Sequence, residues 1–123
     1  MNKVILLVDD GVVQRKIAAL RLESKGYTVT TAANGQEALE LLKRGMRVDA
    51  IVSDVQMPVM DGFDLSRAIR ADSSLAHIPV LLTSASIEDR ERQLAKESGA
   101  FDVIYRSPGL EEVFEVLSGL VSS

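Results

Sequence analysis

The sequence predicts an α/β protein in which a parallel sheet lies between two layers of helices. Two observations predict this fold: short, dense apolar runs recur along the chain, and segments of ten or more residues with helical spacing separate them. Repeated alternation of strand and helix implies right-handed crossovers, and therefore parallel strands. We therefore expect an open three-layer sandwich of five strands and five helices.

Five segments carry the pattern of a strand. Most are apolar at almost every position, as expected of strands that are covered on both faces. The segment at 28–32 alternates between apolar and polar residues, which indicates a strand at the edge of the sheet. The expected strands are Val4–Val8, Thr28–Ala32, Ala50–Val52, Val80–Leu82 and Val103–Tyr105.

Helical spacing of apolar residues marks the segments between the strands. Along the first of them, Ile17 and Leu20, with Ala18 and Leu22 less tightly spaced, form the predicted apolar side. The pattern is clearest at Gln14–Lys25, Glu37–Arg44 and Leu110–Val121.

Capping signals predict where several helices begin and end. Asn34 followed by Glu37 has the spacing of a capping box, and so has Ser86 followed by Asp89. Glycines that come just past helical segments are predicted to end those helices. They are Gly26, Gly45 and Gly99.

The composition is that of one soluble globular domain. The chain has 123 residues, of which 46% are hydrophobic and 26% are charged. This fits a single domain over residues 1–123, either a whole protein or a domain excised from a longer one. The absence of cysteine excludes disulfides and thiolate metal sites. The net charge of −4 argues against direct nucleic-acid binding by this domain.

A membrane or secretory location is not expected. The longest apolar run, Val4–Val8, is too short to span a bilayer. Asp9 and Asp10 end it, and no small-residue cleavage site follows. We therefore expect a cytoplasmic location without membrane contact.

Two of the expected strands end in acidic residues. Asp9 and Asp10 follow the first strand, and Asp54 follows the third. Open parallel sheets bind ligands beyond the carboxyl ends of strands, where the strand order reverses. If these two strands are neighbours, the three carboxylates share one cleft, and their repulsion favours a bound cation, for which Mg²⁺ is the natural candidate. The plainer alternative is that each aspartate only caps a helix or a turn.

Five short motifs then occur in order: Val4-Ile5-Leu6-Leu7-Val8-Asp9-Asp10, Ser53-Asp54-Val55-Gln56-Met57-Pro58, Met60-Asp61-Gly62, Ile78-Pro79-Val80-Leu81-Leu82-Thr83-Ser84-Ala85 and Ser98-Gly99-Ala100. Each is weak alone, but the five together at these spacings are specific. From Lys3 to about Leu120 the chain resembles a response-regulator receiver domain, as found in two-component signalling and chemotaxis. The resemblance implies a flavodoxin-like, doubly wound sheet with the strand order 2-1-3-4-5.

The resemblance also implies roles for the acidic residues. Asp54 corresponds to the phosphoacceptor, which takes a phosphoryl group from a phosphohistidine on a sensor histidine kinase or a phosphotransfer protein and becomes an aspartyl phosphate. Asp10 and Asp54 correspond to direct ligands of Mg²⁺, and Asp9 to a residue that holds the ion largely through water. The backbone carbonyl of Gln56 corresponds to a further ligand. Such a site suits phosphoryl transfer, which depends on positioning and charge neutralisation.

Ser84, at the end of the fourth expected strand, corresponds to the hydroxyl that hydrogen-bonds the phosphoryl group and takes part in the switch. Thr83 is the rival by residue type, but successive strand residues point to opposite faces. The alternative interpretation is that either hydroxyl only caps the following helix.

The end of the fifth strand departs from the family pattern, which has a lysine directly before a proline. Counting forward from Gly99-Ala100 puts Arg106 at the lysine position, whereas counting back from Pro108 puts Ser107 there. The two counts differ by one residue, which predicts a local insertion. Arg106 would keep a positive charge and grip phosphate in a fork, but its reach and planarity differ from those of lysine. The plainer alternative is a surface arginine in a loop.

Two more positions differ from the family. Val103 stands where a tyrosine or phenylalanine usually acts in the switch. Strand alternation puts the nearby Phe101 and Tyr105 on the face of Val103, and the pattern leaves open whether either turns inward. Gly11 replaces a residue that is frequently acidic, which removes one possible charge from the cleft.

The favoured function is a phosphorelay switch. Phosphorylation of Asp54 with Mg²⁺ would change the surface of the fourth helix, fifth strand and fifth helix, and so its contacts with an unknown output domain or protein. The alternative is a pseudo-receiver, an interaction module that docks partners without a working phospho-switch. The altered region at Arg106 and Ser107 supports this alternative, and the intact acid triad argues against it. A homodimer is possible on either hypothesis.

Two other classes are disfavoured. A Mg²⁺-dependent phosphatase would need a substrate pocket and a general acid, for which 123 residues leave no cap domain. We therefore expect no enzyme, beyond assistance to its own phosphotransfer and dephosphorylation. A flavin carrier is disfavoured because only 4% of the residues are aromatic and the acidic cleft would repel a flavin phosphate.

Overall fold

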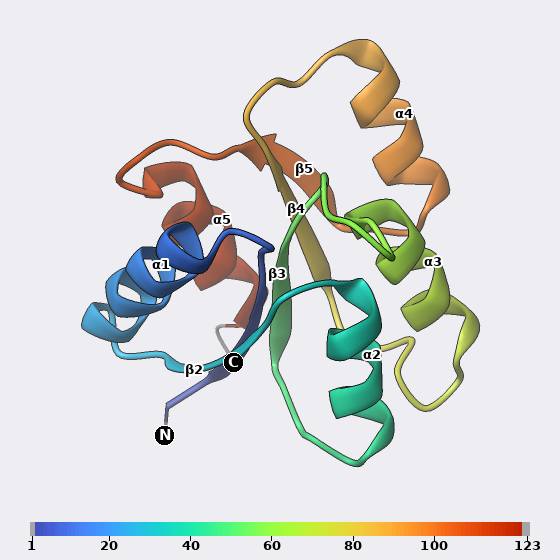
Figure 1. Ribbon diagram of the computed structural model, residues 1–123, viewed down its shortest axis with the longest axis horizontal. Coiled ribbons are helices and arrows are strands. Elements are labelled where there is room, and N and C mark those ends of the chain that lie inside the picture. The colour runs from blue at the N-terminus through green and yellow to red at the C-terminus, as the bar shows by residue number, and fades with distance from the viewer. Residues whose placement is uncertain (1, 122–123) are drawn as a thin grey trace.

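The computed structural model describes residues 2–121 and has the expected architecture. Five parallel strands form one sheet in the order β2-β1-β3-β4-β5, with helices on both faces (Figure 1). The alternating segment at 28–32 is an edge strand, as predicted. The elements are β1 Val4–Val8, α1 Val12–Ser24, β2 Thr28–Ala32, α2 Gly35–Lys43, β3 Ala50–Asp54, α3 Gly62–Ala71, β4 Val80–Ser84, α4 Asp89–Glu97, β5 Asp102–Tyr105 and α5 Glu111–Val121.

The sheet divides the core into two parts, one under each layer of helices. Helices α1 and α5 cover one face of the sheet, and α2, α3 and α4 cover the other (Figure 1). Leu22 and Leu117 are fully buried in the first part, and Ile51 and Leu65 in the second. Within residues 2–121, no helix combines the length and the apolar character that crossing a membrane requires.

Helix α1 faces the sheet with only part of the side that was predicted. Leu22 is fully buried, and Ala18 and Ala19 pack against the same core. Ile17 and Leu20, which were expected on the inward side, are exposed. The larger apolar residues of α1 face outward instead. They form an exposed apolar stripe of Val12, Val13, Ile17 and Leu20.

Most predicted helix ends are confirmed. Asn34 caps α2, because its side chain accepts a hydrogen bond from the Glu37 N–H at 2.9 Å. The three glycines that were expected to end helices come just past α1, α2 and α4, and all have positive φ, a backbone conformation that glycine adopts without strain. They are Gly26 at 95°, Gly45 at 98° and Gly99 at 80°.

The capping box predicted at Ser86 and Asp89 is wrong. Helix α4 begins at Asp89, and the residue that precedes it is Glu88, whose N–H donates to the Glu91 carboxylate at 2.8 Å. The Ser86 carbonyl instead accepts a hydrogen bond from the Ser84 hydroxyl at 2.7 Å. Ser86 therefore belongs to the turn that leaves β4 and does not start the helix.

The loop between β3 and α3 contains a strained residue. Val59 has a φ of 72°, a region that β-branched residues rarely adopt. The Met60 N–H donates to the Pro58 carbonyl at 2.7 Å and closes a three-residue turn around Val59. The side chain of Val59 is 82% exposed, so little packing energy offsets this strain.

Replacing Val59 by glycine is expected to stabilise the domain. The strain of a positive φ is about 1–3 kcal/mol, and the added entropy of glycine in the unfolded chain offsets about 0.5–1 kcal/mol of the gain. We expect the free energy of unfolding to rise by about 1 kcal/mol in metal-free urea denaturation. Val59→Ala, which keeps a Cβ, is the control and should gain less. Unchanged or lower stability of Val59→Gly would show that the turn is not strained.

Candidate functional site

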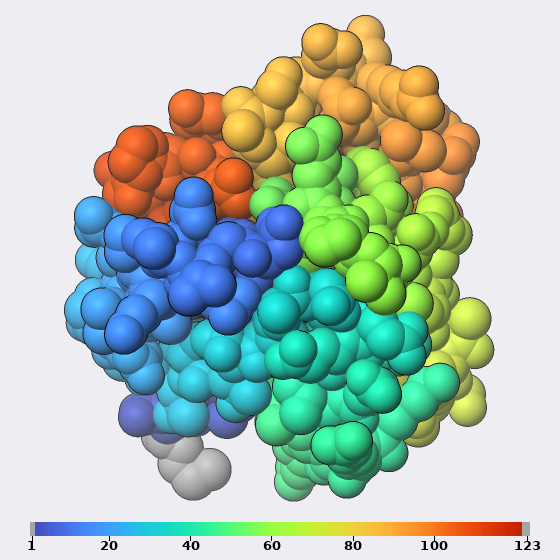
Figure 2. All heavy atoms as spheres, viewed as in Figure 1, coloured from blue at the N-terminus to red at the C-terminus, as the bar shows by residue number. Residues whose placement is uncertain are grey.

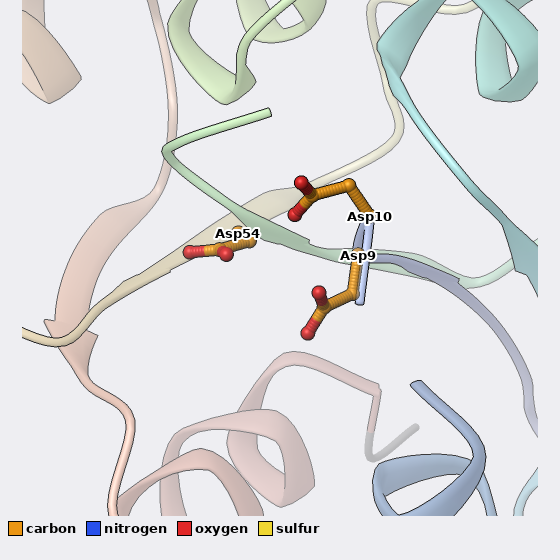
Figure 3. A group of neighbouring side chains, drawn as sticks. All are labelled: Asp9, Asp10 and Asp54. Carbon is orange, nitrogen blue, oxygen red and sulfur yellow. The ribbon is translucent and has the colours of Figure 1, made fainter. Parts of the chain in front are cut away.

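The pairing of β1 with β3 brings three carboxylates together. Val8 lies opposite Ser53, so that Asp9 and Asp10, which follow β1, lie beside Asp54 at the end of β3. One carboxylate oxygen from each aspartate lies within 4.8 Å of the others. Asp9 and Asp10 leave the end of β1 in different directions, and Asp54 lies beside them on the neighbouring strand (Figure 3). The acidic cluster expected from the sequence is therefore present.

The pairing of β3, β4 and β5 brings two more predicted residues to the same edge. Asp54 lies opposite Thr83, which places Ser84 one residue further along β4. Ser84 lies opposite Tyr105, and the N–H of the next residue, Arg106, donates to the Ser84 carbonyl at 3.0 Å. The backbone thus fixes where the Arg106 side chain leaves the sheet.

Asp9 is the most firmly held of the three aspartates. Its Oδ1 accepts a hydrogen bond from the Gly11 N–H at 2.9 Å, and its backbone carbonyl accepts one from Arg15 Nη1 at 2.7 Å. The carboxylate of Asp10 is exposed and has no hydrogen bond or ion pair within residues 2–121. None of the motifs points to Arg15; its only signal is a basic residue in the first turn of the helix after the acid pair.

Arg106 supplies positive charge to the cluster. Its Nη1 lies 2.9 Å from Oδ2 of Asp54 and 3.4 Å from Oδ2 of Asp9. The Ser107 hydroxyl instead donates to the Glu111 carboxylate at 2.5 Å, at the start of α5. Counting forward along the chain therefore matches the geometry, and Arg106, not Ser107, reaches the carboxylates. The alternative of a surface arginine without a partner does not hold, because the Arg106 side chain contacts Asp54 and Asp9.

The charge of this cluster remains incompletely balanced. Burial raises the pKa of the Asp54 carboxyl above its ordinary value, because desolvation disfavours the charged form. The Arg106 guanidinium acts against this rise in pKa, and the negative charge of Asp9 adds to it. Because the net direction is upward, one guanidinium does not compensate for the burial and the repulsion of the carboxylates. A further cation would lower the free energy of the charged site.

The cluster opens into a depression of about 930 Å³. Asp54, Gln56 and Ser84 line it, whereas Thr83 is buried and does not, as strand alternation predicts. The Ser84 hydroxyl donates to the Ser86 carbonyl in the turn before α4, so it does not cap the helix itself. In the space-filling view, the loop after β3 (green) lies between α1 (blue) and α4 (orange) (Figure 2).

A close approach of α3 to the end of β3 supports the site. The Gly62 N–H donates to the Val55 carbonyl at 2.9 Å, and a Cβ on Gly62 would lie 2.5 Å from the Asp54 carbonyl oxygen. Only glycine permits this contact. The preceding Asp61 caps α3 by accepting a hydrogen bond from the Asp64 N–H at 2.8 Å. The Asp-Gly pair of the third motif thus fixes the chain just after Asp54.

The expected position of the switch aromatic holds a buried valine. Val103 is 1% exposed and packs into the core on the α2–α3–α4 side. Phe101 and Tyr105 are each more than half exposed, so neither turns inward. Successive residues of β5 still point to opposite faces of the sheet, but only its two middle residues, Val103 and Ile104, are buried. Tyr105 lines a second, smaller depression beside the loop that precedes α4.

The donors at this edge suit a hard divalent cation. Three carboxylates within 4.8 Å of one another offer oxygen atoms, which Mg²⁺ prefers. Within the described residues, no hydrogen bond occupies the backbone carbonyl of Gln56 in the same depression. The set contains no imidazole or thiolate, which soft transition metals would favour.

Fold and site together define a doubly wound α/β protein with an acidic cleft beyond its central strands, at the point where the strand order reverses. The chain belongs to the response regulator receiver domain family, whose model matches residues 5–118. It is 35% identical to the chemotaxis protein CheY of Pseudomonas aeruginosa, over 94% of this chain and 98% of that protein. The fold class and the family expected from the sequence are confirmed.

Solved structures show the same similarity. The chemotaxis response regulator CheY4 of Vibrio cholerae has a TM-score of 0.87 and 32% identity, over 98% of this chain and 99% of that one. The receiver domain of sensor histidine kinase PA1611 from Pseudomonas aeruginosa has a TM-score of 0.85 and 30% identity, with complete coverage of both chains. That structure was solved with a magnesium ion coordinated in the active site cleft. Receiver domains with this fold therefore include one that holds Mg²⁺ in its cleft.

Replacing Asp54 by asparagine is expected to stabilise the metal-free domain at neutral pH. The pKa of the Asp54 carboxyl is higher in the folded chain than its ordinary value, so the charged carboxylate disfavours folding above that pKa. The gain should shrink as the pH falls through the raised pKa, because the wild-type carboxyl then becomes neutral too. Thermal unfolding in EDTA, from neutral to acidic pH, measures it.

Asp61→Asn is the matched control for this experiment. Asp61 lines the same depression, and asparagine can keep its cap on α3. The control removes the same charge and should change the melting temperature little. A lower melting temperature for Asp54→Asn at neutral pH would contradict the prediction and show that the ion pair with Arg106 outweighs the burial.

Proposed function

We propose that this domain is a phospho-accepting receiver of a two-component phosphorelay. The observation that carries the proposal is the position of Asp54. Its carboxylate lines the depression, lies beside Asp9 and Asp10, and contacts the Arg106 guanidinium at 2.9 Å. An anionic nucleophile needs positive charge nearby to accept another anion, and the Arg106 guanidinium, with a cation held by the carboxylates, would supply it.

The proposed reaction is a substitution at phosphorus. A carboxylate oxygen of Asp54 forms the new P–O bond as the P–N bond to the donor's imidazole breaks, and the imidazole nitrogen keeps the electron pair of that bond. Ser84 and Arg106 line the same depression, and we assign to them the hydrogen bonds to the phosphoryl oxygens. The Ser84 hydroxyl would then leave the Ser86 carbonyl to which it donates. The domain assists this transfer and the later hydrolysis of the aspartyl phosphate, in which water attacks phosphorus and the Asp54 carboxylate is released with inorganic phosphate, and we propose no other catalytic activity.

We propose that Asp9, Asp10, Asp54 and the Gln56 carbonyl hold Mg²⁺. When bound, the ion supplies positive charge that offsets the repulsion between the carboxylates and the incoming phosphoryl group. The Asp9 carboxylate is held by its hydrogen bond from the Gly11 N–H, whereas Asp10 is free within the described residues to turn toward a ligand. The donor set therefore combines one rigid and one adaptable carboxylate.

The proposed phosphodonor is a histidine kinase or a phosphotransfer protein. The apolar stripe on α1 begins two residues after Asp10, so a protein that covers the cleft also reaches this exposed surface. On the other side of the cleft, exposed Tyr105 belongs to the surface of α4, β5 and α5, which we assign to the output partner. A cytoplasmic location without direct nucleic-acid binding belongs to the same proposal.

The pseudo-receiver is the less supported alternative. Its main argument is the missing lysine at the end of β5. The guanidinium of Arg106 nevertheless contacts Asp54 and Asp9, so a positive charge is present at the acceptor. A module that only docks partners has no need of this charge or of three converging carboxylates.

Intact mass spectrometry tests the proposed function. After incubation with Mg²⁺ and acetyl phosphate or phosphoramidate, the parent protein is expected to gain one phosphoryl group, because Asp54 lines the depression beside the proposed metal ligands and contacts the Arg106 guanidinium. Asp54→Ala should gain none, and Asp61→Ala, which removes another carboxylate of the depression, should still be modified. Chelation of the metal with EDTA should suppress the gain in the parent protein.

A titration with beryllofluoride, a phosphoryl mimic, separates slow chemistry from a missing site. Binding that depends on Mg²⁺ and on Asp54 would support the receiver even where the phosphorylated form is short-lived. If the protein shows neither a phosphoryl adduct nor beryllofluoride binding, the phospho-switch is wrong, and docking alone becomes the better hypothesis.

A further inference from the structure

We propose that Arg106 is an internal cation that competes with Mg²⁺ for the carboxylates of Asp9 and Asp54. This inference rests on the metal site of the proposed function and concerns how the chain limits access to that site. The arginine would keep the acceptor partly neutralised while no metal is bound, and would lower the affinity of the cleft for the ion.

The contacts of one nitrogen carry the proposal. Nη1 of Arg106 lies 2.9 Å from Oδ2 of Asp54 and 3.4 Å from Oδ2 of Asp9. These carboxylates provide two of the three acidic groups that converge for a metal ion. A cation that already contacts both of them reduces the attraction that remains for a second cation. Because arginine does not lose its proton in proteins, this competitor is always charged.

The way Arg106 is held allows its side chain to leave. Its backbone N–H is fixed to the Ser84 carbonyl at 3.0 Å, but its side chain is 30% exposed. The guanidinium can therefore turn away from the carboxylates while β5 stays in place. Its Nε and Nη2 have no partner within residues 2–121, so donors remain for another anion. Metal binding and release of the arginine are then coupled in both directions.

Arg15 provides a matched control. Its Nη1 donates to the backbone carbonyl of Asp9 at 2.7 Å, and it contacts none of the three carboxylates. Arg15→Gln therefore removes one positive charge next to the same aspartate without removing a competitor. Arg106→Gln removes the same charge together with the contacts.

Calorimetric titration with MgCl₂ tests the competition in the absence of any phosphodonor. We expect Arg106→Gln to bind Mg²⁺ about tenfold more tightly than the wild type, which corresponds to a gain of about 1.4 kcal/mol in binding free energy. Arg15→Gln should change the affinity by about twofold or less, as a nearby charge without direct contact does. Arg106→Lys keeps the positive charge and controls for a folding defect in Arg106→Gln. Its Mg²⁺ affinity should lie between those of the wild type and Arg106→Gln.

A second readout is thermal stability. Without metal, Arg106→Gln should melt at a lower temperature than the wild type, since two carboxylates lose their counterion. In saturating Mg²⁺ this difference should disappear.

The outcomes separate the two proposals. If Arg106→Gln and Arg15→Gln tighten Mg²⁺ binding equally, or neither does, the competition is wrong and the receiver proposal stands. If no variant, the wild type included, binds Mg²⁺, the metal site is wrong and this inference falls with it.

Discussion

The site depends on the register between β1 and β3. Val8 lies opposite Ser53, and this pairing alone brings the acid pair after β1 level with Asp54. Both strands are covered on both faces, and successive residues of β1 enter different parts of the core: Leu6 lies on the α2–α3–α4 side and Leu7 on the α1–α5 side. A slip of one residue would exchange these faces throughout a strand. Core packing thus holds the geometry of the acidic cluster.

That geometry is maintained against electrostatic repulsion. Burial and the charge of Asp9 both raise the pKa of the Asp54 carboxyl, and Arg106 reverses only part of this effect. A chain selected for stability alone would separate these carboxylates or replace one of them. The same repulsion would be relieved by a bound cation, so the local instability and the proposed metal site arise from one arrangement.

The sequence predicts the fold and the acidic cluster because both depend on local patterns. Dense apolar runs define the strands, and the motif that contains Asp54 follows one of them. The inward side of α1 could not be predicted in this way, since two sides of that helix have helical apolar spacing. Ala18, Ala19 and Leu22 pack against the core on the α1–α5 side, whereas the larger Ile17 and Leu20 are exposed.

Counting along the chain also has a physical limit at the end of β5. The two reference points give counts that differ by one residue, and spacing cannot show which count places a side chain in the cleft. The strand ladder shows it, because Ser84 lies opposite Tyr105 and so places Arg106 directly beyond the sheet. Ser86 is a related case: its capping pattern is present, but the Ser84 hydroxyl bonds its carbonyl within the turn after β4.

Arg106 connects Asp54 to the outer surface through only a few residues. Arg106 contacts Asp54 through its side chain and Ser84 through its backbone, and the adjacent Tyr105 is exposed beside the loop that precedes α4. A buried valine fills the place of the usual switch aromatic, so no interior aromatic side chain has to move. A change in the partners of Arg106 would then act on the surface through one peptide unit and the strand pairing of Ser84 with Tyr105. On the proposed function, β5 would be the element that couples the charge of the cleft to the outer surface.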